Sequence, residues 1–510
     1  ITGSFLMAIQ AEGIQFGPWQ TVNYSVPAID LEPNVLSRIE NMYLDNAGSL
    51  NTRRGTAKYI SSALSGSPSV VATGKQRFTA SSSAVFAIAG TKLYEDVDGT
   101  WTDRTASITI TAHIDKYWVT ANAGGTLIGV NGIGNDAPIK WTAAGGNIAA
   151  AGMGSSGVTS ADSTVFWDNR LWYVSTNQGE RLAHYSSTTD ITSFGANDYY
   201  ITDGQITGAA PIKSFLGLHN EDGIWGLFPT GNADIPYSIQ RRADRGTISR
   251  RSLITDEYGN QLFMRRDGIY EWGGSEPPQK VSGNFDGSEF WDNINKDRLS
   301  YSFAHLVTSD DQVWFWIPYG TNQQYMNVAI IWNYKLRQWV GVYTGNTRIC
   351  GAYFEDLPHL GGNADGLLFK HNTGTNDATL SFTVKATTAA TPPVSVATRV
   401  RWLYARHEFN AADVAYDTSV YQTGPGIVTK GDTFQVGDPT DALVTAFTIG
   451  SSSIRSATTA FVNDTDLHGY SPVSQIRYEN STLDQPITVR RSMLMYKPIG
   501  YETVRKLGVH

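Results

Sequence analysis

The sequence has very little cysteine: Cys350 is the one thiol among its 510 residues. A single cysteine forms no disulfide within a chain, so nothing in the sequence favours an oxidising secretory compartment. We interpret Cys350 as a small buried apolar residue. Long hydrophobic runs are missing as well, since no segment approaches the roughly 18 apolar residues of a membrane-spanning helix. We therefore expect no membrane insertion.

Basic charge is the next deficit. The 39 lysines and arginines are outnumbered by 47 aspartates and glutamates, which gives a formal net charge of −8. A protein that binds duplex nucleic acid by neutralising phosphates normally carries a basic excess. No such excess is present here, and a mildly acidic surface suits solubility, or a channel that should not stick to DNA.

Motifs for metal and nucleotide chemistry are absent or incomplete. The nine histidines never form H-x-H or H-E-x-x-H, so a zinc site of ordinary spacing is not expected. Gly152–Gly157 matches G-x-G-x-x-G, but it leads into a predicted strand rather than a helix, which favours a plain loop. Asp96–Trp101 lacks the third carboxylate and the distal glutamate of a calcium loop. The sequence therefore predicts no cofactor and no metal site.

A catalytic constellation is also missing. No Gly-x-Ser-x-Gly elbow is present. A glycosidase would need two carboxyl groups facing each other across a pocket, whereas adjacent acids on turns are usually solvated. The adjacent acids are Glu221/Asp222, Asp256/Glu257, Asp310/Asp311 and Glu355/Asp356. We predict no catalytic residues and expect that the chain is not an enzyme.

Glycine and aromatic residues are plentiful, with 50 glycines, 14 tryptophans and 25 tyrosines. This composition suits many short strands with tight turns rather than helices. One pattern recurs, in which a turn is followed by an apolar-aromatic pair in a short strand. The aromatic members are Tyr94, Trp172, Trp225, Tyr270, Phe315 and Phe369. The gaps between them are 78, 53, 45, 45 and 54 residues, and a weaker unit at 125–130 and 139–141 fits inside the longest gap.

Repeats of about 40 to 50 residues made of short strands predict a β-propeller with four strands per blade. We expect six or seven blades over residues 60–374. The clearest blade hairpin spans Gln261–Trp272, where Asp267-Gly268 is expected to form a type I′ turn, because both positions need positive φ. Every Asp-Gly pair of the chain lies between Asp98 and Gly366, so the composition changes after the repeats.

The remaining segments predict a second domain. Strands with alternating character at 379–385, 398–406 and 487–496 favour a β-sandwich-like domain over residues 375–510. Residues 1–59 are expected to form a strap and strands that pack with it. The predicted fold class is therefore all-β, a β-propeller with an additional β-sandwich-like domain.

Convincing helices are few. The best candidate is Pro33–Asn41, where Leu36, Ile39 and Glu40 have roughly helical spacing.

The densest basic stretch lies at Gln240–Arg251, with Asp244 as its one acid. Its arginines are Arg241, Arg242, Arg245, Arg250 and Arg251. The planar donor fork of arginine suits a contact with an acidic neighbouring subunit and equally a contact with the DNA backbone. A solvated loop with ion-paired strand faces is the third interpretation. These five arginines are the candidate inter-subunit or DNA-contact residues.

Three segments resemble one protein family. Glu40–Tyr59, which reads ENMYLDNAGSLNTRRGTAKY, resembles the start of tail proteins of short-tailed bacteriophages. The matching positions are Asn41, Asp45, Gly48, Leu50, Arg54 and Gly55. Ser163–Ser175 with His184–Phe194, and then Gly246–Gly274, resemble the same family in order and spacing. The family is the tail nozzle, also called tail tubular protein B or packaged-DNA stabilisation protein.

The resemblance covers roughly residues 30–285 and implies a structural virion protein of the tail, assembled in the host cytoplasm. Such proteins form a ring, typically a hexamer, below the portal, and the ring extends and closes the DNA ejection channel. The partners implied are further copies of the chain, the head–tail adaptor, tail fibre, spike or needle proteins, and genomic DNA in passage. The opening segment would then be a strap, with Asp45, Arg53 and Arg54 as candidate strap contacts.

An alternative interpretation is a carbohydrate-binding or glycoside-cleaving propeller that binds a receptor, because aromatic faces stack on sugars. Most of the tryptophans lie beside other apolar residues in predicted strands, which favours blade core instead. A propeller scaffold of a cellular complex is a third possibility. An enzyme predicts a monomer with a deep pocket and converging acids, whereas a nozzle predicts a ring with large lateral interfaces.

Overall fold

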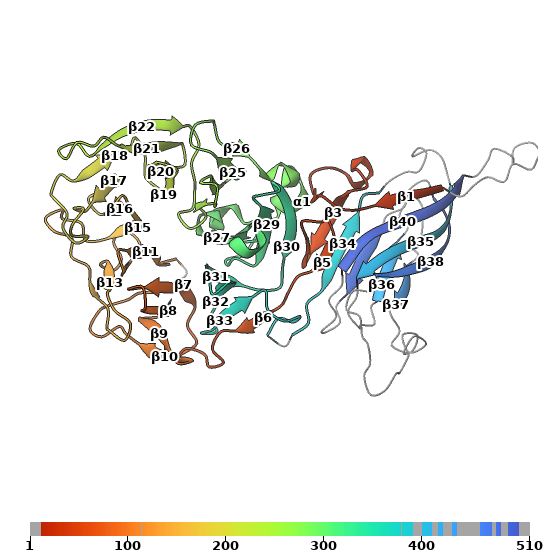
Figure 1. The fold of residues 1–510 in the computed structure, drawn as a ribbon, viewed down its shortest axis with the longest axis horizontal. Coiled ribbons are helices and arrows are strands. Elements are labelled where there is room, and N and C mark those ends of the chain that lie inside the picture. The colour runs from red at the N-terminus through yellow and green to blue at the C-terminus, as the bar shows by residue number, and fades with distance from the viewer. Residues whose placement is uncertain are drawn as a thin grey trace, which may run out of the picture. The chain divides into compact units, whose positions relative to one another are not determined.

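The computed structural model describes residues 12–113, 115–378, 380–390, 400–410, 417–421, 431–435, 460–471, 476–480 and 488–498. The chain divides into two compact units. The propeller unit contains residues 56–337 and 344–374, and the sandwich unit contains residues 1–55, 338–343 and 375–510. Figure 1 shows the strands that build each unit.

The propeller unit contains seven blades within its described residues: six are separate four-stranded antiparallel sheets, and one is formed by the antiparallel strands between residues 303 and 333 (Figure 1). The innermost strands of blades 1 to 7 are β7 (Val70–Arg77), β11 (Val119–Ala123), β15 (Ala161–Trp167), β19 (Gly208–Ile212), β23 (Ile254–Thr255), β27 (Phe303–Val307) and β31 (Arg348–Phe354). Each innermost strand contacts that of the next blade, and β31 contacts β7, so the ring is closed. The predicted propeller is confirmed, with seven blades.

The outer strands of the blades follow in chain order. The second strands are β8 (Ser83–Ala89), β12 (Thr126–Val130), β16 (Arg170–Thr176), β20 (Phe215–Asn220), β24 (Gln261–Arg265), β28 (Gln312–Ile317) and β32 (Leu357–Gly362). The third strands are β9 (Lys92–Val97), β13 (Ile139–Trp141), β17 (Gly179–Tyr185), β21 (Gly223–Pro229), β25 (Gly268–Trp272), β29 (Val328–Asn333) and β33 (Leu368–His371). The fourth strands of blades 1 to 5 are β10 (Thr100–Asp103), β14 (Ala149–Ala150), β18 (Tyr199–Ile201), β22 (Tyr237–Ala243) and β26 (Gln279–Lys280).

Blade 7 is completed by a strand from the start of the unit. β6 (Thr56–Lys58) pairs antiparallel with β33 and becomes the outermost strand of this blade. The residues of β6, which the sequence analysis assigned to the N-terminal strap, therefore belong to the propeller sheet. This pairing joins the two ends of the repeat region.

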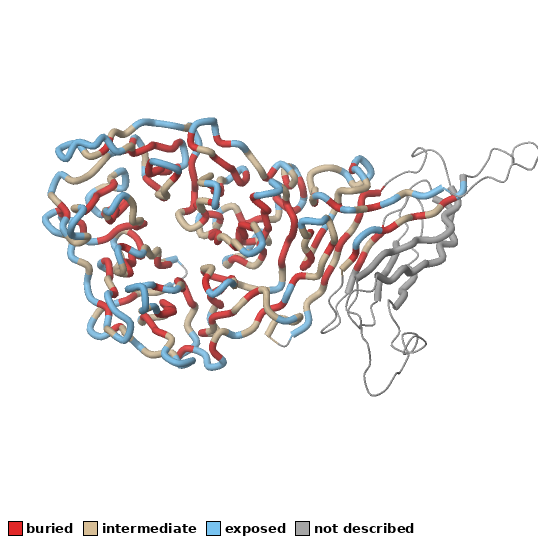
Figure 2. The backbone as a smooth tube through the Cα atoms, in the orientation of Figure 1, coloured by how far each residue is buried: buried red, intermediate tan, exposed pale blue. Residues whose placement is uncertain are grey.

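The hydrophobic core of the propeller unit consists of clusters that join neighbouring blades. Figure 2 shows that buried residues occur on every blade. One cluster joins Phe86 of blade 1 and Trp141 of blade 2 to Ile349 of blade 7. Fully burying a side chain such as Phe86 contributes about 1.5–3 kcal/mol. Among the tryptophans whose side chains the structure describes, only Trp101 and Trp167 are partly exposed. The tryptophans therefore serve mainly as blade core.

The sandwich unit is built from both ends of the chain. One sheet contains β2 (Thr21–Val22), β3 (Val35–Glu40), β34 (Val384–Thr388) and β39 (Arg477–Asn480). The other contains β30 (Gln338–Tyr343), β4 (Met42–Leu44), β5 (Leu50–Thr52), β40 (Thr488–Pro498), β35 (Val400–Asn410) and β38 (Ala460–Ser471), with β1 (Glu12–Phe16) paired to β40. β36 (Asp417–Tyr421) and β37 (Gly431–Gln435) form a separate hairpin. The two main sheets meet where the buried hydroxyls of Tyr478 and Ser492 share a hydrogen bond.

The predicted helix at Pro33–Asn41 is wrong, because most of this segment forms β3. A register shift between Leu36 and Arg38 marks a β-bulge in that strand. The bulge lets Leu36 and Ile39, three residues apart, both be fully buried. A bulged strand thus imitates the spacing of a helix.

The helices that the structure does describe are short. They are η1 (Ala28–Asp30), η2 (Ser282–Phe285), α1 (Glu289–Asp292), η3 (Lys296–Tyr301) and η4 (Thr308–Asp310). None of the helices in the described ranges has the length and apolar character needed to cross a membrane.

The hairpin predicted at Gln261–Trp272 is present, but its turn lies one residue earlier than predicted. Arg265 pairs with Gly268, so the loop consists of the two residues between them. Gly268 is needed for space, because a Cβ there would lie 2.4 Å from the hydroxyl oxygen of Ser282. The type I′ geometry occurs instead at Asp98-Gly99, where φ is 51° and 80°.

Candidate interaction site: the arginine segment 240–251

The arginine segment, which we define as residues 240–251, runs from the outer rim of blade 4 to the propeller axis. It begins in β22, the outermost strand of blade 4, and ends just before β23, the innermost strand of blade 5. Arg241 has a half-exposed side chain that lies over the ring of Trp225 and pairs with Asp203 at 3.8 Å. An exposed pair of this length contributes little to stability.

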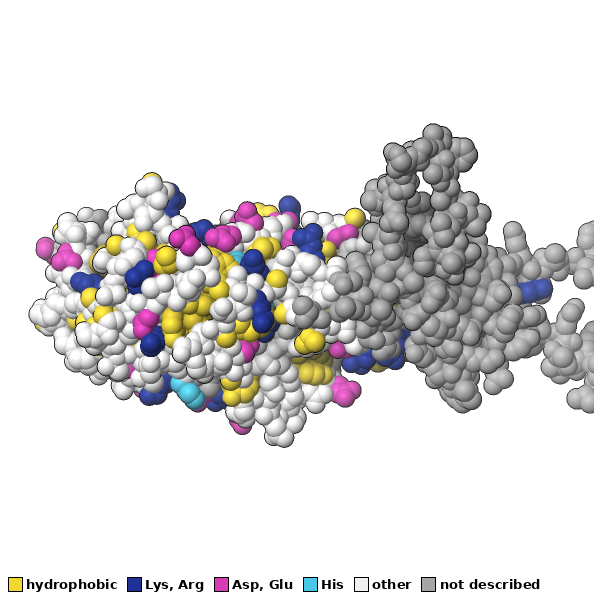
Figure 3. Space-filling model, turned by 90° about the horizontal axis from the view of Figure 1, so that it is seen from below, with side chains coloured by type: hydrophobic (Ala, Val, Ile, Leu, Met, Phe, Trp, Pro, Cys, Tyr) yellow, Lys and Arg dark blue, Asp and Glu magenta, His cyan; other side chains and the backbone are white. Residues whose placement is uncertain are grey.

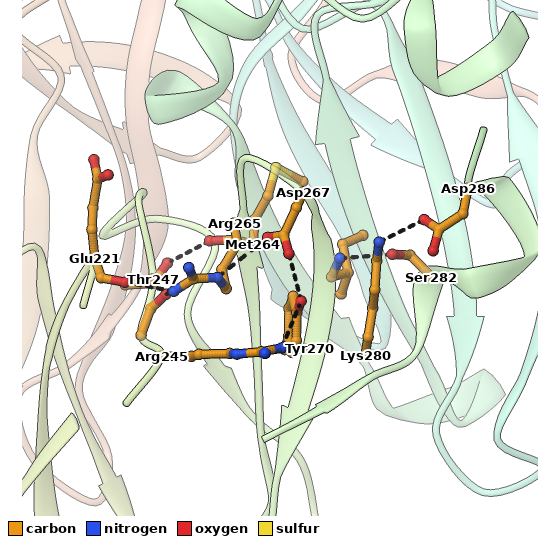
Figure 4. A network of polar contacts seen from close by, with 12 residues as sticks. Glu221, Arg245, Thr247, Met264, Arg265, Asp267, Tyr270, Lys280, Ser282 and Asp286 are labelled. Carbon is orange, nitrogen blue, oxygen red and sulfur yellow. Dashed lines mark hydrogen bonds and ion pairs between the residues drawn. The ribbon is translucent and has the colours of Figure 1, made fainter. Parts of the chain in front are cut away.

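Arg242 and Arg245 are exposed and have no carboxylate partner among the described residues. Arg242 donates to the carbonyl oxygen of Gly274 at 3.2 Å. Arg245 donates to the hydroxyl of Tyr270 at 3.2 Å, and that hydroxyl donates to Asp267 at 2.6 Å (Figure 4). Both guanidinium groups therefore keep an unneutralised charge at the rim.

Arg265 holds the same region from blade 5 (Figure 4). Its guanidinium lies 3.3 Å from Asp267 and donates to the carbonyl oxygens of Glu221 and Gly246. Burial, together with the hydrogen bond to Asp267, raises the pKa of Tyr270. The tip of the β24–β25 hairpin is thus fastened to blade 4.

Arg250 turns into the propeller. Its side chain is only 10% exposed, and its guanidinium lies 3.4 Å from the Asp162 carboxylate and also donates to the Asp162 carbonyl oxygen. The same guanidinium lies 4.3 Å from the ring centroid of Tyr117. Asp162 belongs to β15 of blade 3, and Tyr117 immediately precedes blade 2, so Arg250 ties blade 5 to both.

The guanidinium of Arg251 also lies over the ring of Tyr117, 3.6 Å from its centroid. It donates to the carbonyl oxygens of Tyr301 and Ile349, each at 2.6 Å. These oxygens belong to the approach to blade 6 and to the innermost strand of blade 7. Burial lowers the pKa of Arg251 to about 10, which leaves the group charged at neutral pH. Carbonyl oxygens and an aromatic face, rather than a carboxylate, stabilise this charge.

The structure thus separates the five candidate arginines into two groups. Arg250 and Arg251 bind other blades of their own propeller, whereas Arg241, Arg242 and Arg245 stand at the rim within reach of a partner. The sequence carries no sign of this division, because both groups contain the same Arg-Arg pair. Tyr117, which receives both buried guanidinium groups, was not singled out from the sequence.

The opening segment forms the β4–β5 hairpin of the sandwich unit. Asp45 organises its turn, since one carboxylate oxygen accepts from the backbone N–H groups of Ala47 and Ser49 and the other from the amide of Asn51. Gly48 has φ of 77°, and a Cβ on it would lie 2.6 Å from the carbonyl oxygen of Trp19. Asp45 therefore acts within its own turn.

Arg53 is the buried centre of the strap, with a side chain only 2% exposed. It makes a bidentate pair with Asp377, with one bond of 2.8 Å, and its Nε donates to Asn41 at 2.9 Å. Its guanidinium also lies 3.8 Å from the ring centroid of Phe382. Arg54, by contrast, is exposed, and its carbonyl oxygen accepts from Arg53. The strap contact is therefore made by Arg53.

We searched the described residues for clusters of side chains that could bind a metal ion or act in catalysis. They contain no cluster of three or more histidine, cysteine, aspartate or glutamate side chains able to hold a metal ion. Three of the adjacent acids, which lie in turns, form ion pairs with cations from other parts of the propeller unit: Glu221 with Arg266, Asp311 with Lys335, and Glu355 with Lys75.

One acidic pair escaped the sequence analysis. Asp256 and Glu271 are both buried, and burial raises the pKa of each carboxyl group. Arg337 pairs with Glu271 at 2.6 Å, and Asp256 accepts from the backbone N–H groups of Tyr258 and Asn260. The arrangement fastens a turn of blade 5 to the turn that follows β29. The two acids are 15 positions apart in the sequence, so no local motif predicts that they lie close together.

Comparison with known proteins found only distant similarities among solved structures. No protein-family model and no curated protein matches the chain. Among solved structures, the RRP9 WD40 repeats align with 63% of this chain and 99% of their own, at 12% identity and a TM-score of 0.42. YCF48 bound to D1 peptide aligns with 61% of this chain and 95% of its own, at 11% identity and a TM-score of 0.38.

A third similar structure is the extracellular domain of BT4673, a one component system from B. thetaiotaomicron. The alignment covers 90% of this chain and 63% of that chain, at 10% identity and a TM-score of 0.41. Matches this distant carry no argument about activity. The class of the protein rests on its own closed ring of sheets: it is a seven-bladed β-propeller with an attached β-sandwich unit.

Proposed function

We propose that this chain is a structural protein of a short-tailed bacteriophage tail, a nozzle subunit that assembles into a ring, taken as a hexamer. The ring would extend the DNA channel below the portal and adaptor and close it until ejection. It would be assembled in the host cytoplasm and carried in the virion. Its partners would be the head–tail adaptor and a tail fibre, spike or needle protein.

The observation that carries the proposal is that the segments resembling the nozzle family contain the contacts that hold each of the two units together internally. Segment 40–59 contains the hairpin and the buried Arg53 pair that fasten the strap. Segment 246–274 contains the two arginines that cross-link the propeller axis. The segments that resemble the family thus contain buried ion pairs and hydrogen bonds that hold each unit together, as a building unit of a tube requires.

The filled axis supports one further element of the proposal. Arg250, Arg251 and Tyr117 occupy the centre of the propeller with their own side chains. DNA would therefore pass through a lumen between subunits rather than through a propeller. The acidic balance of the chain suits such a lumen, because few phosphates would be neutralised during passage.

A carbohydrate-binding propeller is the second candidate, and one observation favours it. Trp101 and Tyr59 are partly exposed on blades 1 and 7, with ring centroids 6.0 Å apart and planes tilted by 40°. The Tyr59 hydroxyl donates to Asp96 at 2.7 Å, so an acid stands beside the rings. Aromatic faces next to a carboxylate can bind a sugar.

Electron microscopy of the phage particles whose genome encodes the chain tests the proposal. An antibody raised against the propeller unit should label a symmetric ring at the tail, and mass spectrometry of the particles should find the chain in multiple copies. A chain missing from purified particles would overturn the proposal. Saturable binding to one sugar on a glycan array, lost in Trp101→Ala, would then favour the second candidate.

A further inference from the structure

Two edges of the propeller unit differ in charge and both expose apolar side chains. The first, which we call the arginine rim, consists of Ile201, Ile235, Arg241, Arg242 and Arg245. Ile201 is 51% exposed and Ile235 is 61% exposed. The Tyr200 hydroxyl accepts from the backbone N–H of Tyr237 at 3.0 Å and donates to its carbonyl oxygen at 2.9 Å, so β18 and β22 lie side by side.

The second edge is the acidic hairpin, formed by Asp96, Val97, Asp98 and Trp101 of blade 1. Val97 is 38% exposed, and Trp101 is partly exposed. Neither aspartate forms an ion pair with a lysine or arginine among the described residues. Figure 3 views the edge that carries β9 and β10 and shows hydrophobic side chains gathered there, with charged side chains beside them.

These two edges lie on different sides of the propeller. In Figure 1, β22 follows the upper edge of the ring of blades and β10 the lower edge. Both are outermost strands, and each pairs with only one neighbour within the described residues. Each edge is thus the end of a sheet with exposed side chains, which is the situation in which a further chain can add.

We propose that the arginine rim of one copy binds the acidic hairpin of the next copy, so that copies join head to tail. Two arginines without a carboxylate partner would face two aspartates without a cation. The exposed isoleucines would cover Val97 and Trp101. Because the two surfaces differ and lie on separate sides, the contact is heterologous, and it generates a ring when the rotation between successive copies closes. This inference rests on the proposed ring and names the two faces of its lateral interface.

Charge reversal on the isolated full-length chain tests the contact. Arg242→Glu with Arg245→Glu reverses the charge of the arginine rim, and Asp98→Arg cancels the charge of the acidic hairpin, because Asp96 keeps its negative charge. Each change alone should weaken self-association in analytical ultracentrifugation by at least about tenfold. A chain carrying all three changes should recover part of the association lost in Arg242→Glu with Arg245→Glu, because the arginine introduced at position 98 attracts the two introduced glutamates.

The controls separate lost contact from lost fold. Asp98→Asn keeps a residue suited to the left-handed turn and removes only the charge, so association should fall by less than in Asp98→Arg. Arg38→Glu, on an exposed side chain of the sandwich unit, should leave association unchanged. Thermal unfolding of every variant should match the wild type.

The outcomes distinguish this inference from the proposed function. If the wild type associates and the separate charge changes do not weaken it, or the combined change restores none of it, the contact is wrong while a ring remains possible. A wild type that stays monomeric at every concentration overturns the contact as well. If association follows the charges but the chain is missing from phage particles, the contact stands and the nozzle proposal falls.

Discussion

At the scale of single residues, Arg251 brings a charge into an interior that gives it no carboxylate. Two carbonyl oxygens at 2.6 Å and the ring of Tyr117 take that role. Moving a cation out of water costs several kcal/mol unless its donors are paired. The side chain is therefore stable only when blades 5, 6 and 7 and the approach to blade 2 stand in their native arrangement, which makes it sensitive to ring closure.

Arg251→Met should destabilise the propeller unit by about 2–4 kcal/mol, because two charge-assisted hydrogen bonds are lost and two buried carbonyl oxygens are left without donors. Urea unfolding followed by tryptophan fluorescence measures the change. Arg241→Met is the matched control and should change stability by no more than about 0.5 kcal/mol, since its side chain is half-exposed. Equal effects of the two variants would contradict the distinction between axis and rim.

The Arg53–Asp377 pair supports a second prediction. Arg53→Ala should destabilise the sandwich unit by about 3–5 kcal/mol, because it removes the bidentate guanidinium partner of a largely buried carboxylate. A double-mutant cycle with Asp377→Asn should give a coupling free energy of about 1–3 kcal/mol. Arg54→Ala, on an exposed neighbour, serves as the control and should be nearly neutral. Additive effects of the two strap substitutions would argue against the pair as a joint.

The sequence indicated several of these residues but not the partners that they contact. Arg53 and Asp45 were singled out from a resemblance, yet nothing local indicated that Arg53 would pair with a residue 324 positions away. The arginines of segment 240–251 were identified because they are dense in the sequence, but their density does not indicate where each side chain points. Whether an arginine faces solvent or the axis depends on where the crossing segment enters the ring, and that is a property of the closed fold.

At the scale of elements, Gly55 marks a close approach between two backbones of the sandwich unit. A Cβ on Gly55 would lie 2.0 Å from the carbonyl oxygen of Asn376, and a backbone atom cannot swing away as a side chain can. Gly55→Ala should therefore lower stability by about 2 kcal/mol or more, measured by calorimetry. Gly283→Ala, with nothing within 4 Å of the added carbon, should have little effect. An unperturbed Gly55→Ala variant would mean that the two backbones can separate freely.

Turn chemistry and repeat spacing predicted most of the propeller elements. The weak unit placed at 125–130 and 139–141 corresponds to β12 and β13 of blade 2. The aromatic markers do not occupy equivalent strands, since Trp172 lies in a second strand and Trp225 in a third. Their uneven gaps follow from that, which is why blade number could only be given as six or seven.

The errors at this scale have local causes. The bulge in β3 placed two buried residues three apart and suggested a helix. In the blade 5 hairpin, Gly268 was assigned to the turn because Asp-Gly favours positive φ, whereas its place is set by the crowding of Ser282. Periodicity predicts which side chains are buried, but it does not reveal where a ladder slips or a neighbouring strand approaches.

At the scale of the whole propeller unit, buried histidines make stability depend on pH. Burial lowers the pKa of His219 and of His359 to about 4, and that of His305 to about 3. The unfolded chain takes up protons on these groups near pH 6.5, whereas the folded chain does not. Stability should therefore be constant above about pH 6.5 and fall as the pH drops towards 4, by up to about 1.4 kcal/mol per pH unit for each histidine.

His305→Phe isolates one of these contributions. Neither ring nitrogen of His305 has a hydrogen-bond partner among the described residues, and the ring packs against Trp314. The variant should keep the stability of the wild type at pH 7 and lose less of it between pH 6.5 and 4. Unfolding free energies measured in urea across this range test the expectation. An unchanged slope would show that the acid sensitivity comes from other groups.

The pairing of β6 with β33 also orders events during synthesis. Residues 56–58 leave the ribosome long before residues 368–371, with which they complete blade 7. Non-local pairing of this kind slows folding and leaves a nascent chain exposed while it waits. An mRNA truncated before the codon for residue 368 would therefore produce an open arc of blades with an unpaired strand edge at each end, and not a smaller closed ring.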